Sequence, residues 1–166
     1  MEDRGAFGFL TVVDSPTHGL FGGYLLVDPL GRPLEFHCTA PVKVSRAQQI
    51  LYGPTLHAHL HGDRIGAALV AEATVTPVVV LTDVEPMLTV RSRLGQPLAL
   101  VRPCDPLDQP VDTAGFTIGA ARVSPHPGDQ GDEAFLRERL AEFGATVDLR
   151  EPFERIRAAI DEAQRH

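Results

Sequence analysis

Thiol and imidazole side chains gather in one short part of this sequence. His37 and Cys38 end a predicted strand, and His57, His59 and His61 follow on a predicted helix. Soft and borderline donors of this kind bind transition metals such as zinc. This part of the chain is therefore a candidate metal site.

The spacing of these side chains limits which of them can share one ion. His57 and His61 are four residues apart and share a face of a regular helix, whereas His59 points away. His37 and Cys38 are neighbours on a strand, so only one of the two can join a given site. We predict a zinc-type site on His57 and His61, with His37 or Cys38 as the third ligand. The alternative is that the histidines are exposed or helix-capping residues.

Two aspartates form a second pattern, because each lies at the end of a predicted strand. Asp14 follows the apolar run 7–13, and Asp83 ends the run 76–83. Runs rich in aromatic and β-branched residues are typical of strands buried on both faces. Two carboxylates placed close together hold one or two magnesium ions, which position a phosphodiester and activate a water. Asp14 and Asp83 are therefore candidate catalytic and metal-binding residues.

The predicted elements describe an α/β fold with a single mixed sheet. An N-terminal antiparallel three-stranded meander is followed by parallel crossovers and a helical C-terminus. Three prolines in the stretch 103–110 predict a loop. The strands are expected at residues 7–13, 24–28, 33–38, 76–83, 97–102 and 116–123, and the helices at about 45–52, 55–73, 85–94, 132–143 and 149–160.

This order of elements over roughly residues 6 to 102 resembles that of the ribonuclease H-like superfamily, a group of metal-dependent nucleases and their relatives. In that family, acids at the ends of the first and fourth strands lie side by side, since these strands are neighbours in the sheet. The resemblance implies that Asp14 and Asp83 form such a pair. The family usually supplies further acids, and Glu35, Asp161 and Glu162 match none of its spacings.

Composition sets the class of protein and its partners. The length of 166 residues, with 43% apolar and 22% charged residues, predicts one globular domain over residues 1–166. The acidic start and the lack of an apolar run of about 20 residues predict a cytoplasmic protein with no membrane contact. A net charge of −7 without a basic run disfavours nucleic acid as a partner.

Two functional hypotheses remain, and the sequence does not decide whether the chain is an enzyme. The leading hypothesis is a divalent-metal-binding protein, in its specific form a metal-dependent phosphodiester hydrolase using magnesium or zinc. No organic cofactor is expected, because the motifs GxxxxGK and GxGxxG are absent. The alternative is a non-catalytic binding or assembly subunit of a cytoplasmic complex. Its partner would be another protein or a second copy of the chain, and His37, His57 and His61 would be incidental.

Overall fold

The N-terminal meander is present in the computed structural model, which describes residues 5–104 and 115–165. Strands β1 (Ala6–Ser15), β2 (Gly19–Val27) and β3 (Pro33–Cys38) pair antiparallel in sequence order. The turn between β2 and β3 contains Gly31 at φ 83°, a conformation that glycine adopts readily. The predicted hairpin is therefore confirmed.

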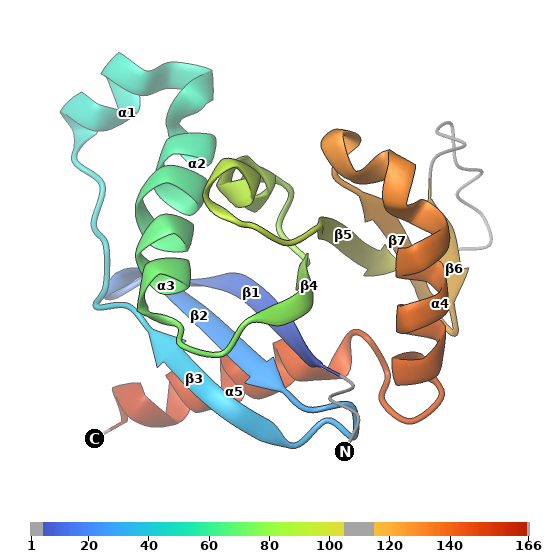
Figure 1. The fold of residues 1–166 in the computed structure, drawn as a ribbon. Helices are drawn as coiled ribbons and strands as arrows, with labels where there is room; N and C mark the ends of the chain where they lie inside the picture. Colours follow the sequence, from blue (N-terminus) through green and yellow to red (C-terminus); the bar gives the residue numbers. More distant parts are fainter. Residues whose placement is uncertain (1–4, 105–114, 166) are drawn as a thin grey trace.

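Parallel strands extend this meander into one mixed sheet (Figure 1). β4 (Pro77–Thr82) pairs parallel with β1, and β5 (Leu98–Pro103) pairs parallel with β4. The full strand order is β3-β2-β1-β4-β5-β7-β6. The predicted fold class is confirmed, and so is the expectation that the first and fourth strands are neighbours.

The region from residue 116 to 123 differs from the prediction of one edge strand. It forms a hairpin of β6 (Phe116–Ile118) and β7 (Ala121–Pro125), with Gly119 in the turn at φ 57°. Of these two strands, only β6 lies at an edge of the sheet, because β7 pairs antiparallel with β5. The alternation of apolar and polar residues continues through the turn, so the sequence pattern does not reveal the turn. Most of the predicted loop 103–110 lies outside the described residues.

The helices lie on both faces of the sheet (Figure 1). The predicted helix 55–73 consists of three segments, the middle one being a π-helix, and the predicted helix 85–94 is a 3₁₀-helix. None of the helices in the described part of the chain is long and apolar enough to cross a membrane. The helical elements are α1 (Arg46–Tyr52), η1 (Gly53–Thr55), α2 (Leu56–Ala58), η2 (His59–Gly66), α3 (Ala67–Glu72), η3 (Glu85–Arg93), η4 (Pro127–Asp132), α4 (Glu133–Gly144) and α5 (Glu151–Gln164).

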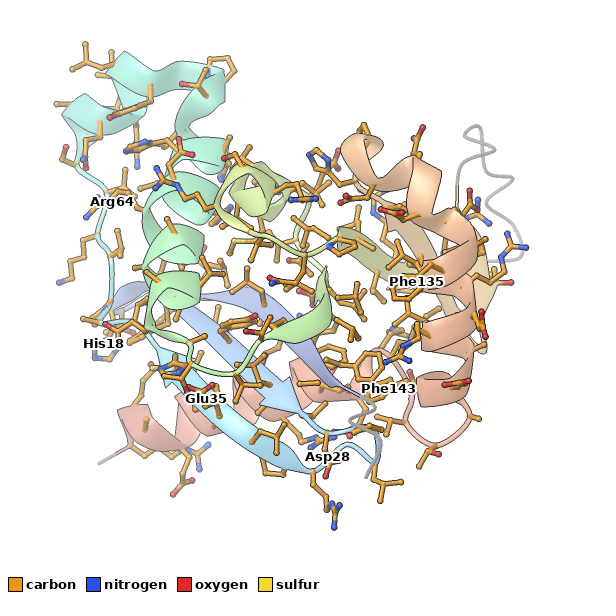
Figure 2. All side chains as sticks on the ribbon, viewed as in Figure 1. His18, Asp28, Glu35, Arg64, Phe135 and Phe143 are labelled. Atoms are coloured by element: carbon orange, nitrogen blue, oxygen red, sulfur yellow. The ribbon has the colours of Figure 1, made fainter. Side chains whose placement is uncertain are left out.

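Alternation along β1 divides the core into two layers. Phe7 and Phe9 point to the side of the sheet covered by α4 and α5, where Phe143 (labelled in Figure 2) stacks on Phe7 with ring centroids 4.4 Å apart. Leu10 points to the opposite side, where it packs with Ile65 and the residues of α3 and η3. We call these sides the α5 face and the α3 face.

Candidate functional site

Asp83 lies just beyond the end of β4, on the α5 face. Its Oδ1 accepts a hydrogen bond from the buried Thr11 hydroxyl at 2.5 Å, and its Oδ2 accepts one from the guanidinium of Arg157 on α5. The side chain is 17% exposed. Both carboxylate oxygens therefore already have partners, one of which carries a full positive charge.

Asp14 lies three residues beyond Thr11 on β1, which pairs with β2 in unbroken register as far as Ser15. Because side chains alternate along a strand, Asp14 leaves the sheet on the α3 face, opposite to Thr11. The Asp14 carboxylate is close enough to His61 to act on the pKa of that histidine. Asp14 thus belongs with the histidines rather than with Asp83.

The two predicted catalytic carboxylates are therefore on neighbouring strands but on opposite faces. A shared magnesium cluster needs carboxylate oxygens that converge and are free to bind metal. As placed, the pair of Asp14 and Asp83 does not fit such a cluster. Among residues 5–104 and 115–165, no three His, Cys, Asp or Glu side chains form a group that could hold a metal ion.

His57 and His61 are brought together, as their spacing predicts. Their ring centroids are 5.5 Å apart, whereas the ring of His59 stacks on Tyr52 at 4.4 Å. His57 is exposed, but His61 is only 8% exposed. Its Nδ1 atom is buried without a hydrogen-bond partner in the described structure. Burial lowers the pKa of His61, the nearby His57 lowers it further, and Asp14 acts in the opposite direction.

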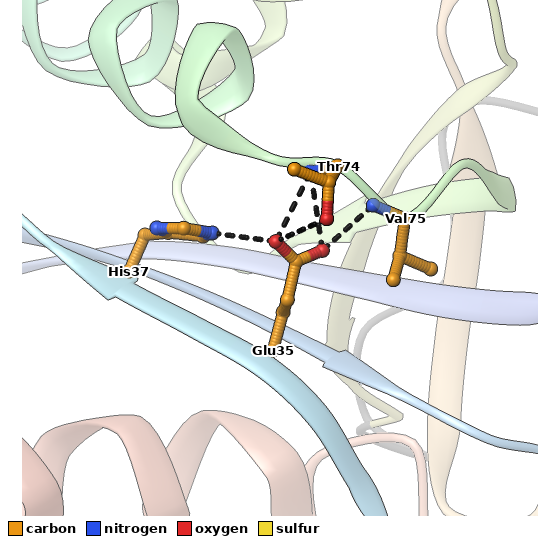
Figure 3. A network of polar contacts seen from close by, with 4 residues as sticks. All are labelled: Glu35, His37, Thr74 and Val75. Carbon is orange, nitrogen blue, oxygen red and sulfur yellow. Dashed lines mark hydrogen bonds and ion pairs between the residues drawn. The ribbon is translucent and has the colours of Figure 1, made fainter.

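His37 is held by a polar network that the sequence did not predict (Figure 3). The Glu35 carboxylate accepts hydrogen bonds from the backbone N–H groups of Thr74 and Val75, and from the Thr74 hydroxyl. His37 Nε2 lies 3.0 Å from Glu35 Oε1. These contacts, the backbone hydrogen bonds foremost, lower the pKa of Glu35 to about 2. Glu35 thus joins edge strand β3 to the segment before β4.

Cys38 faces away from this network, as strand alternation predicts. Its thiol is exposed and lies 3.5 Å from the backbone carbonyl of Thr39. With His18, Phe21 and Ile160 it lines a cavity of about 200 Å³ next to the C-terminal end of α5. Partial burial raises the pKa of the Cys38 thiol. A raised pKa reduces the thiolate fraction, so this cysteine is a poor nucleophile at neutral pH.

Asp129 is a buried acid that sequence reasoning missed. It is 2% exposed, and it accepts hydrogen bonds from the Arg91 guanidinium at 2.7 and 2.9 Å and from the Leu98 backbone at 3.0 Å. Burial alone would raise the pKa of Asp129, but the bonds from Arg91 and Leu98 outweigh it and lower the pKa. Nothing in its proline- and glycine-rich surroundings signals this role.

An apolar and basic arm projects from the body of the protein (Figure 1). We define the arm as residues 43–55, which include α1 and η1. All residues of α1 are described, and none is buried; Ile50 is 67% and Leu51 83% exposed. The arm contains Lys43 and Arg46 but no acidic residue, in a chain of net charge −7.

A second apolar surface lies along β3, at the opposite end of the sheet from β6. It includes the exposed side chains of Leu30, Leu34 and Phe36. A side chain at Gly23 would meet Ile156 and Ile160 of α5 and approach Phe36, so this surface adjoins α5. α5 carries four acids and two arginines, and three of the acids form ion pairs: Glu151 with Arg155, Glu154 with Arg157, and Asp161 with the cap residue Arg165. We call the surface of Leu30, Leu34, Phe36 and α5 the β3 edge.

Comparisons with known proteins identify no family for this chain. No family model and no curated protein matches it. Among solved structures, endonuclease V of Ciona intestinalis, in complex with DNA, has a TM-score of 0.38 and 14% identity over 65% of this chain and 49% of that one. Argonaute of Marinitoga piezophila, in complex with guide RNA, has a TM-score of 0.35 and 10% identity over 75% and 23%. This chain spans about half the length of the endonuclease.

Proposed function

We propose that this chain is a non-catalytic assembly subunit that associates with a second copy of itself through the arm. The observation that carries this proposal is the exposure of Ile50 and Leu51 on a helix with no buried residue. Burial of apolar surface contributes about 25 cal/mol per Å². A partner that covers these side chains would therefore gain affinity from them.

Local structure supports a docking role for α1. Ser45 and Gln48 form a capping box, with their reciprocal hydrogen bonds at 3.0 and 3.1 Å. The chain just before the arm is held to the sheet by two hydrogen bonds of 2.8 Å between Leu20 and Val42. Yet α1 has only seven residues, and isolated helices this short are marginal in water. Contact with a partner would stabilise it.

Charge favours a second copy as the partner. The arm is basic and apolar, whereas the β3 edge is apolar and flanked by the acids of α5. Surfaces of opposite charge steer association and exclude other orientations. A reciprocal exchange, in which each arm lies on the β3 edge of the other copy, closes with two-fold symmetry.

Light scattering after size exclusion tests this proposal. We expect the purified chain to form a dimer and the Leu51→Asp variant to elute as a monomer. Gln49→Asp is the matched control, because it adds the same charge at an exposed position of α1 that is not apolar. Both substitutions are at exposed positions, so circular dichroism should show unchanged folding. A monomeric wild-type chain, or equal dimerisation of both variants, would refute the proposal.

A metal-dependent phosphodiester hydrolase that uses Asp14 and Asp83 is the second proposal, supported by the pairing of β1 with β4. It requires Arg157 to release Asp83 and Asp14 to turn toward it. The test is cleavage of DNA and RNA with Mg²⁺ by the wild-type chain and by Asp83→Asn. Cleavage that disappears in the variant would support the hydrolase; no cleavage, or equal cleavage, would exclude it. The cytoplasmic location and the single domain stay predictions from composition.

A further inference from the structure

His61 is a buried polar residue whose hydrogen-bonding capacity is not used. It is 8% exposed, and its Nδ1 atom has no partner in the part of the chain that the structure describes. Leaving a buried polar atom unpaired costs about 1 to 3 kcal/mol. Native structures rarely keep such an atom without a reason, and a bound water or ion is one such reason.

The position of His57 suggests what kind of ligand this is. Its ring centroid lies 5.5 Å from that of His61, with 34° between the ring planes. Zinc binds imidazole nitrogens at about 2.0 to 2.1 Å with tetrahedral angles, which places the centroids of two bound rings about 5 Å apart. The observed separation is therefore close to what one shared ion requires.

The backbone holds this pair at its spacing. η2 (His59–Gly66) is a π-helix, so the helical turn that carries His61 is wider than an α-helical turn. π-helical segments are rare and often occur at functional sites. Thr89 of η3 lies against the same segment, because its hydroxyl donates to the Ala58 carbonyl at 3.3 Å and leaves no room for a side chain at Gly62.

Charge near the pair also favours a cation. Asp14 reaches the α3 face from the end of β1 and acts electrostatically on His61. Imidazole prefers borderline divalent ions such as Zn²⁺, whereas Mg²⁺ prefers oxygen ligands. The described residues hold no ready-made three-ligand group, so two imidazoles would have to be the protein ligands.

We propose that His57 and His61 bind one borderline divalent metal ion of the zinc type, with water completing its coordination and Asp14 supplying negative charge nearby. This site lies at the base of the arm, where α2 and η2 begin. It does not depend on the proposed self-association, since both ligands belong to the same copy.

Titration calorimetry with Zn²⁺ on tag-free, chelator-treated full-length protein tests the site. We expect one Zn²⁺ per chain, with an affinity at least about tenfold lower in His57→Ala, because even outer contacts of bound metals contribute 10- to 100-fold. Asp14→Asn should lose less than His57→Ala. Mg²⁺ in excess should not displace Zn²⁺.

His59→Ala is the matched control, because His59 lies between the two ligands but stacks on Tyr52 instead. His57 is exposed, so its replacement should leave folding intact, which thermal unfolding checks. Unchanged Zn²⁺ affinity in His57→Ala, equal losses in His57→Ala and His59→Ala, or no saturable binding to the wild-type chain would each overturn the proposal.

Discussion

Two corners at the same end of the sheet, one around Asp83 and one around His61, differ in whether their polar atoms have hydrogen-bond partners. On the α5 face, Asp83 has a hydrogen-bond donor on each oxygen, Thr11 and Arg157. On the α3 face, His61 keeps a buried nitrogen without a partner in the described structure. Both carboxylate oxygens of Asp83, the acid expected to be catalytic, are therefore hydrogen-bonded within the fold. Of these two groups, His61 is the one with unused hydrogen-bonding capacity.

The largest effect is expected at the most deeply buried acid of the described residues, Asp129, which is 2% exposed. Replacing it by alanine leaves Arg91 and the Leu98 N–H without their acceptor. Breaking a buried ion pair in this way costs about 3 to 5 kcal/mol. Because Arg91 is partly exposed, we expect the free energy of unfolding to fall by about 3 kcal/mol. Denaturant unfolding measures it. A loss below about 1 kcal/mol would show that such networks do not stabilise this fold.

Thr11→Val should have the next largest effect, since it removes one donor to Asp83 and keeps the side-chain shape. Thr11 is fully buried, and we expect a loss of about 1 to 2 kcal/mol in the free energy of unfolding. Thr117→Val is the control, because Thr117 is an exposed strand residue. Equal effects of the two substitutions would contradict a structural role for the bond to Asp83.

Glu35→Gln should give a smaller, pH-dependent effect. The folded state lowers the pKa of Glu35 from 4.5 to about 2. The stabilisation is therefore complete above pH 4.5 and is lost as the pH falls toward 2. The difference in stability between wild type and variant should be largest at neutral pH and shrink over this range. Glu138→Gln, at an exposed site on α4, is the control. A pH-independent difference would contradict this account of Glu35.

The smallest effect, and one of opposite sign, is expected for His61→Leu. Leucine has a similar volume and removes the unpaired Nδ1, so the metal-free protein should be unchanged or more stable by up to about 1 kcal/mol. Thermal unfolding in the presence of a chelator measures this. A clear destabilisation would mean that His61 is satisfied within the fold, and the contrast between the two corners would disappear.

Strand positions and neighbours from β1 to β5 could be predicted from the sequence, because apolar runs and the order of elements determine them, whereas the hairpin of β6 and β7 could not. The face of the sheet on which each of the side chains of Asp14 and Asp83 lies could not be predicted. A shift of one residue in where a strand is taken to end moves a side chain to the other face. The hydrogen-bond partner of Asp83 could not be predicted either, since Arg157 lies 74 residues away and has the pattern of a surface residue on an amphipathic helix.

For the histidine pair, in contrast to the two aspartates, the sequence predicted correctly which side chains lie together. The proximity of His57 and His61 follows from helical spacing, which is local and therefore readable in the sequence. The burial of His61 and the π-helix around it depend on packing against η3, which no local pattern reveals. The third ligand expected from His37 or Cys38 stays a prediction, with His37 held by Glu35 and Cys38 facing away from that network.

Sedimentation equilibrium of the wild-type chain over a range of concentrations measures self-association through the arm. The account predicts that the mass rises with concentration toward twice the chain mass of 18.0 kDa, and that Leu51→Asp stays at the chain mass. A wild-type mass that stays at that of one chain at every concentration would contradict it.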